Sequence, residues 1–240
     1  MFHPFERALK PGIIADPAGA APTVQIGIEI PGVTLGVITV ENVKVAPTTP
    51  ELFAEMDAVC ERLRGELTIA GVAELESIGA VRRMFRAWGV DPARYRPASE
   101  ALLRRVEQGK GLYRVSNVVD IINLGSIETG WPYGTYDTAQ VTPPVVLRMG
   151  AAGEAYEGIG RHVWHLEGRP VLADAQGPFG SPVSDSIRTM ITEATRTVLT
   201  VIFAPSGSSQ PAIEQALNRV GDRLARFAGG RVASTEMIQR

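Results

Sequence analysis

The sequence predicts an α+β domain in which helices dominate the first half and short strands the second. Apolar residues recur at helical spacing in four stretches before residue 131, and short β-branched runs separated by Gly and Pro come after it. The 25 glycines and 17 prolines also favour tight turns over a helical bundle. We therefore expect one α+β domain over residues 23–240, preceded by an N-terminal arm over residues 1–22.

Alternating apolar residues open the domain. Two such runs, over 24–30 and 33–37, flank Pro31-Gly32, and this pattern predicts a β-hairpin. A helix over residues 50–64 follows, because Thr49-Pro50 supplies an N-cap residue and a proline at the first helical position.

Three more helices are expected before residue 131. Two of them cover 73–88 and 97–109 and end at glycines. The third runs from Ser116 or Asn117 to a stop at Gly130 and is apolar around most of its surface. Its polar residues form one narrow stripe: Asn117, Asp120 and Asn123. We therefore expect a buried helix in which Asn123 needs a hydrogen-bond partner.

The second half of the chain predicts strands and one last helix. Strands are expected over 145–148, 162–166, 170–173 and 197–203. Ser209 then opens a C-terminal helix whose apolar residues are in phase up to Phe227.

Composition excludes several classes of protein. The fractions of hydrophobic residues (45%) and charged residues (21%) are those of a globular protein, and the formal net charge is -2. No apolar run is long enough to cross a membrane and the N-terminus lacks the pattern of a secretion signal, so we expect a cytoplasmic protein with no membrane partner. The single cysteine, Cys60, excludes an intramolecular disulfide.

No motif for a metal, a cofactor or a serine nucleophile is present. His162 and His165 lie on a predicted strand, where their side chains point to opposite faces, and no third ligand has metal spacing. The sequence also lacks a Gly-x-Ser-x-Gly elbow, a P-loop and a dinucleotide fingerprint. We therefore expect no cofactor and no metal.

Basic residues are concentrated in one segment. Residues 82–114 contain nine basic and three acidic residues, a local charge of +6 within an acidic chain. Such a segment could contact nucleic-acid phosphates locally while the acidic remainder of the chain limits non-specific binding. Alternatively, it could be a solvated helix face. The candidate tRNA-binding residues are Arg96, Arg104, Arg105, Lys110 and Arg114.

A glycine-rich loop is expected over residues 177–186, after a strand. Glycine backbone N–H groups can approach a ligand closely, although turns between strands use the same residues. We predict that this loop lies at one end of the buried helix.

Residues 96–100 and 109–114 look more like the stand-alone relatives of one synthetase domain than like the synthetase itself. Three other stretches resemble that domain, the tRNA-binding and editing domain of the phenylalanyl-tRNA synthetase beta subunit. They are residues 116–124, residues 128–137 and the segment from Val171 through the glycine loop to Leu199. The likeness is strongest over residues 95–205. The resemblance implies a β/β/α layered sandwich and a ligand pocket between the helix and the glycine loop. No catalytic synthetase domain fits in 240 residues, so aminoacylation is excluded.

The resemblance implies substrate-binding residues, some of which match. The family's asparagine falls on Asn123 and its two glycines fall on Gly177 and Gly180, next to Ser181. Three positions depart from the family: its threonine falls on Ile122, its histidine on Gly134, and its late glutamate near Thr200 or Val201. Tyrosine-specific editing is therefore not implied, because the groups that read a phenolic hydroxyl are missing.

Three functions are compatible with these residues. The first is a module that binds tRNA or an amino-acid-like ligand without turnover. The second is a free-standing aminoacyl-tRNA deacylase, in which N–H groups of residues 177–181 would stabilise an oxyanion. The third is a structural or interaction protein that keeps only the fold. The expected partner is tRNA or aminoacyl-tRNA and not DNA, and no catalytic residue is assigned.

Overall fold

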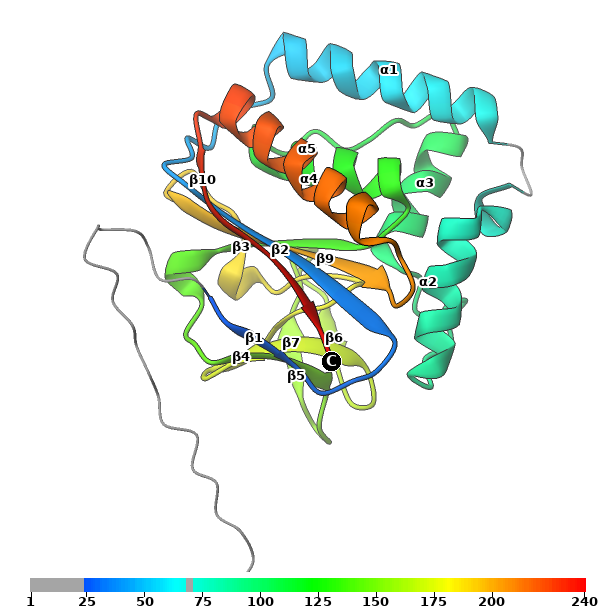
Figure 1. Cartoon of the computed structure of the whole chain (residues 1–240), viewed down its shortest axis with the longest axis vertical. Helices are drawn as coiled ribbons and strands as arrows, with labels where there is room; N and C mark the ends of the chain where they lie inside the picture. Colours follow the sequence, from blue (N-terminus) through cyan, green and yellow to red (C-terminus); the bar gives the residue numbers. More distant parts are fainter. Residues whose placement is uncertain (1–23, 68–70) are drawn as a thin grey trace, which may run out of the picture.

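The computed structural model describes residues 24–67 and 71–240, so the predicted arm over 1–22 lies outside the described residues. The fold has three layers: helices, a central sheet and a second sheet (Figure 1). The fold is thus α+β, as the sequence patterns predict, with the β/β/α layers that the resemblance implies.

The central sheet has the strand order β10-β2-β9-β3 and is antiparallel throughout. Its strands are β2 (Val33–Glu41), β3 (Tyr133–Asp137), β9 (Thr197–Pro205) and β10 (Arg231–Gln239). Nearly every residue of β2 and β9 is buried, because layers cover both faces of the sheet. This explains why these strands are nearly continuous apolar runs.

The second sheet has the order β1-β4-β7-β8, and a separate hairpin, β5-β6, lies beside it. The strands are β1 (Ile26–Ile28), β4 (Val145–Met149), β5 (Ala155–Glu157), β6 (Val163–His165), β7 (Pro170–Asp174) and β8 (Gly177–Gly180). Short 3-10 turns occupy Gly71–Glu74, Thr138–Gln140 and Ile187–Thr189.

Helices α4 (Asn117–Thr129) and α5 (Gln210–Ala228) cover the other face of the central sheet. Gly36 of β2 permits the close approach of α5, because a Cβ there would lie 2.9 Å from the Ile213 side chain. Around them lie α1 (Pro50–Glu66), α2 (Glu76–Ala87) and α3 (Ala98–Glu107). All five helices were predicted.

The predicted hairpin over 24–37 is wrong in its pairing. Both strands form, but β1 pairs with β4 in the second sheet while β2 pairs with β9 and β10 in the central sheet. Gly32, with φ of 82°, turns the chain from one sheet to the other. Alternation identifies a strand but does not identify its partner.

Other strands were not predicted. They are β3, β5, β8 and β10. The predicted loop over 177–186 begins as β8, paired with β7. The C-terminal helix is present, but β10 follows it and completes the edge of the central sheet. Neither strand has the apolar pattern of a buried strand. β10 is an exposed edge strand with many polar residues, and β8 contains two glycines and a proline.

Candidate functional site

A hydrogen-bonded pair of side chains lies between the two sheets. Tyr136 of β3 is fully buried and donates a 2.9 Å hydrogen bond to a carboxylate oxygen of Asp185, which follows β8. Its ring also makes an edge-to-face contact with Phe179, with ring centroids 4.9 Å apart. The pair therefore joins the central sheet to the second sheet.

Two glycines make room for the Tyr136 hydroxyl. A Cβ at Gly134 or at Gly180 would overlap this hydroxyl oxygen. Gly134 is the position where the resembling family carries histidine, and Gly180 is one of its two loop glycines. The space that these glycines leave is thus filled by the chain's own tyrosine.

The Asp185 carboxyl is electrostatically unusual. Burial raises its pKa to about 7, although hydrogen bonds from Tyr136 and from backbone N–H groups favour the charged form. Burial also raises the pKa of Tyr136 well above its ordinary value. Asp185 therefore changes charge close to neutral pH while the tyrosine stays protonated.

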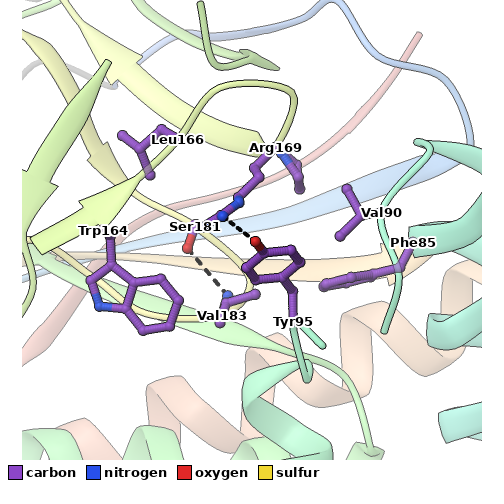
Figure 2. A pocket seen from close by; sticks show the side chains of 9 residues that line it. Phe85, Val90, Tyr95, Trp164, Leu166, Arg169, Ser181 and Val183 are labelled. Carbon is purple, nitrogen blue, oxygen red and sulfur yellow. Dashed lines mark hydrogen bonds between the residues drawn. The ribbon is translucent and has the colours of Figure 1, made fainter. Parts of the chain in front are cut away.

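Ser181, whose backbone N–H donates to Asp185, also lines a small hollow. The hollow lies between α2 and the β5-β6 hairpin and holds about 10 Å³, roughly enough for one water molecule. Figure 2 shows Arg169 reaching across it to Tyr95, with Trp164 and Ser181 beside them. Arg169 donates to the Tyr95 hydroxyl and stacks over its ring at 3.6 Å. This hollow is too small for an aminoacyl group.

The predicted substrate-binding residues are not brought together. Tyr133 and Tyr136 lie three residues apart on β3 and so face opposite sides of the central sheet. Tyr133 faces α4, where it limits the space at Gly125, whereas Tyr136 faces β8. Asn123 on α4 and Gly177 and Gly180 on β8 thus belong to opposite outer layers. The predicted position of the loop at one end of the helix is wrong.

Ser181 has a structural environment. Its hydroxyl donates to the Ser184 carbonyl at 2.7 Å and accepts from the Ser184 N–H at 3.1 Å, so it closes a turn. Its backbone N–H donates to Asp185 at 3.3 Å. The Ser181 N–H, one of the N–H groups of residues 177–181 that the deacylase hypothesis invokes, is therefore already engaged.

The polar stripe of α4 has a different role at each position. Asn117 is 2% exposed, and its side chain bonds to the backbone of Lys44, Ala46 and Phe227. Asp120 is fully buried and accepts from Thr48 and from the Val115 N–H. Asn123 is half-buried, and no hydrogen bond of its side chain is found within the part of the chain that the structure describes.

Two of the five predicted tRNA-binding residues converge on a buried carboxylate. Glu100 is 0% exposed and accepts from Arg82 at 2.6 and 2.8 Å and from Arg104 at 2.9 Å, while Arg96 lies 3.8 Å away. Burial by itself would raise the pKa of Glu100, but the hydrogen bonds from Arg82 and Arg104 hold it below its ordinary value. Arg104 is therefore a structural residue, whereas Arg96 stays half-exposed.

The other three predicted residues have no such partner. Arg105, Lys110 and Arg114 have no carboxylate within 4.0 Å among residues 24–67 and 71–240. The guanidinium of Arg105 stacks over Tyr113 at 3.9 Å and that of Arg114 over Phe53 at 3.5 Å. These three cations lie at the end of α3 and in the segment that leads to α4.

Sequence reasoning missed Asp185, Glu100 and Tyr113 as site residues. Glu100 and Tyr113 lie within the basic segment, whose charge drew attention to the arginines alone. Asp185 meets Tyr136 across 49 positions of sequence, and no local pattern reports such a contact. The one available signal for this contact was the spacing of Gly134 and Tyr136, because a small residue two positions from a large one can leave space for its side chain.

A metal site and a membrane-spanning helix are both missing from the described residues. In the described part of the chain, no group of three or more His, Cys, Asp or Glu side chains could hold a metal ion. No helix within the described ranges is long and apolar enough to span a membrane.

One solved structure has a similar overall arrangement at low sequence identity. It is an N-terminal fragment of the phenylalanyl-tRNA synthetase beta subunit from Pyrococcus horikoshii, with a TM-score of 0.46 and 14% identity. The match covers 92% of this chain and 56% of that one, so the chain spans about half the length of that fragment. Comparison with curated proteins gave no match.

The family is identified from the sequence between α2 and α5. Residues 80–228 match the B3/4 domain, a domain found in the phenylalanyl-tRNA synthetase beta subunit. The match includes α3, α4, β3, β8, β9 and α5, and it covers more than half of the chain. The resemblance predicted from the motifs is thereby confirmed, and the chain belongs to the B3/4 domain family.

Proposed function

We propose that this chain is a tRNA-binding module without aminoacylation or ester-hydrolysing activity. The observation that carries the proposal is the set of cations at Arg105, Lys110 and Arg114, none of which has a carboxylate within 4.0 Å among the described residues. Guanidinium and ammonium groups that form no close ion pair are suited to phosphate oxygens. Membership of the B3/4 family supports tRNA as the source of those phosphates.

Binding is favoured over hydrolysis because the proposed aminoacyl pocket is filled. The Tyr136 side chain occupies the space beside Gly134 and Gly180, and the Ser181 N–H already donates to Asp185. An ester group would need both the space and a free N–H donor. In this proposal the protein therefore contacts the tRNA body or its end and does not read the amino acid.

Binding is tested with labelled tRNA and the purified chain by fluorescence anisotropy at low and moderate salt. We expect the affinity to fall steeply with salt, because each neutralised phosphate releases counterions. The double variant Lys110→Gln/Arg114→Gln should weaken binding to all tRNA species. Arg62→Gln is the matched control, since Arg62 is an exposed cation on α1 that pairs with Glu66.

Hydrolysis is tested separately with a panel of aminoacylated tRNAs and a no-protein reference. We expect the ester half-life to be unchanged. Faster loss of one aminoacyl ester would favour the deacylase hypothesis instead. Failure to bind any tRNA would contradict the proposal and leave the structural or interaction role.

A further inference from the structure

The connector between α3 and α4, residues 108–116, runs along α1 (Figure 1). At one end, a Cβ on Gly109 would lie 3.3 Å from the guanidinium carbon of Arg64 on α1. At the other end, Arg114 stacks over Phe53, near the start of α1. The connector is therefore held along a rigid helix.

The connector exposes an aromatic ring. Tyr113 is 53% exposed although the guanidinium of Arg105 lies 3.9 Å from the centroid of its ring. Val115, two residues further on, is 63% exposed. A ring has two faces, and a cation that packs on one face leaves the other available for stacking.

Arg105 packs on this ring, Lys110 and Arg114 lie on the same connector, and none of the three cations has a carboxylate within 4.0 Å among the described residues. Lys110 and Arg114 are exposed, and Arg105 is half-buried, with its Nε lacking a hydrogen-bond partner. From Arg105 to Arg114 the only acidic residue is Glu107, which leaves a net charge of +2. The guanidinium planes rest on aromatic rings, so their N–H edges are oriented before any ligand binds.

We propose that the connector binds an unpaired nucleotide of RNA, with the base stacked on Tyr113 and the adjoining phosphates bound by Lys110 and Arg114. This inference rests on the proposed tRNA-binding function and specifies which part of the RNA is contacted. A stacked base requires a strand whose base faces are accessible, which a duplex does not offer. An exposed ring beside cations is the arrangement with which proteins bind single strands without sequence preference.

The experiment compares a short labelled single-stranded RNA of mixed sequence with the same strand in a duplex. Tyr113→Ala should weaken binding of the single strand by about 5- to 150-fold, the range measured for one stacked base. Tyr113→Phe should bind like the wild type, because it keeps the ring. The matched control is Val163→Ala. It truncates another exposed side chain, on the strand β6 and outside the connector.

The salt dependence of RNA binding distinguishes the contribution of the Tyr113 ring from that of the cations. Tyr113→Ala should leave the slope of log affinity against log salt unchanged, whereas Lys110→Gln should reduce it by about 0.7 for a single strand. Thermal unfolding of each variant verifies that it is folded, and Tyr113 is exposed enough for its truncation to be tolerated.

The outcomes distinguish this inference from the proposed function. If tRNA binds but Tyr113→Ala and the wild type bind the single strand equally, the stacking inference is overturned and the proposed function stands. If the single strand binds through Tyr113 but tRNA does not bind, the proposed function fails and the stacking site remains. If neither RNA binds the wild type, both are overturned.

Discussion

The hydroxyl of Tyr136 donates a 2.9 Å hydrogen bond to Asp185 and so joins β3 of the central sheet to the segment after β8 of the second sheet. The carboxyl also accepts from the Ser181 N–H at 3.3 Å. The buried Asp185 carboxyl is thus hydrogen-bonded both to the central sheet and to the turn that begins at Ser181. A change in its charge changes the strength of both hydrogen bonds.

The first prediction concerns the pH dependence of stability. Burial raises the pKa of Asp185 to about 7 in the folded chain, well above its unfolded value. The folded state therefore binds more protons between about pH 4 and pH 7, and the free energy of unfolding falls as the pH rises through this window. The fall is at most about 1.4 kcal/mol per pH unit.

Asp185→Asn removes this titration and keeps an oxygen that can accept from Tyr136. We expect its free energy of unfolding to fall less between about pH 5 and pH 7 than that of the wild type, as measured by urea denaturation. Asp222→Asn, at an exposed position of α5, is the control. Parallel pH curves for Asp185→Asn and the wild type would refute the assignment.

The second prediction concerns the coupling between Gly134 and Tyr136. Gly134→Ala places a Cβ on the Tyr136 hydroxyl, so it should cost about 1–3 kcal/mol, as overpacking does. In a Tyr136→Ala background, the same substitution should cost almost nothing because the space is open. A double-mutant cycle from chemical denaturation measures the coupling, expected at about 0.5–3 kcal/mol. Equal costs of Gly134→Ala in both backgrounds would contradict this packing.

The third prediction compares two arginines near Glu100. Arg82 makes two short hydrogen bonds to this fully buried carboxylate and is 21% exposed, whereas Arg96 is 48% exposed at 3.8 Å. Arg82→Ala should cost about 2 kcal/mol, less than the 3–5 kcal/mol of an isolated buried charge, because Arg104 still pairs with Glu100. Arg96→Ala should cost less than about 1 kcal/mol.

Urea denaturation of the two variants tests this difference, and equal losses of unfolding free energy would contradict it.

The same geometry around Glu100 determines which charge substitutions are suitable for RNA-binding experiments. Arg104→Glu would set a second carboxylate against Glu100, so this reversal would report on folding and not on RNA binding. Lys110 and Arg114 are the better positions for charge substitutions, because they are exposed.

The helices and their ends could be predicted because their signals are local. Thr49 and Ser116 were expected at N-caps, and each side-chain oxygen accepts from the N–H three residues on, at 3.3 Å. Gly130 was expected to stop α4, and it adopts the left-handed conformation with φ of 74°. Caps and apolar periodicity depend on neighbours in sequence, so no tertiary information was needed.

Strand pairing and the candidate site could not be predicted in the same way. β1 and β2 are adjacent in sequence but belong to different sheets, and the Tyr136–Asp185 bond joins distant residues. The resemblance supplied the layers, the match at Gly180 and the departure from the family at Gly134. It did not supply Tyr136 as the occupant of their space, because that depends on the three-dimensional packing of β3 against β8.

The last prediction contrasts Asn117 and Asn123, two members of the same polar stripe on α4. Asn117 is 2% exposed, and its amide nitrogen donates to the carbonyls of Lys44 at 3.0 Å and Phe227 at 2.9 Å. Asn117→Ala would leave these two partly buried carbonyls without that donor, each at a cost of about 1–3 kcal/mol, so we expect a loss of at least about 2 kcal/mol.

Asn123→Ala should change the free energy of unfolding by less than about 0.5 kcal/mol, because Asn123 is half-buried and no side-chain hydrogen bond holds it within the described chain. Chemical denaturation of both variants measures the contrast, and anisotropy with aminoacylated and free tRNA measures ligand binding. If Asn123→Ala destabilises the fold as much as Asn117→Ala does, Asn123 has a structural partner. If it instead weakens binding only of the aminoacylated form, the amino acid is read from the helical layer, and the proposal that the protein does not read the amino acid is wrong.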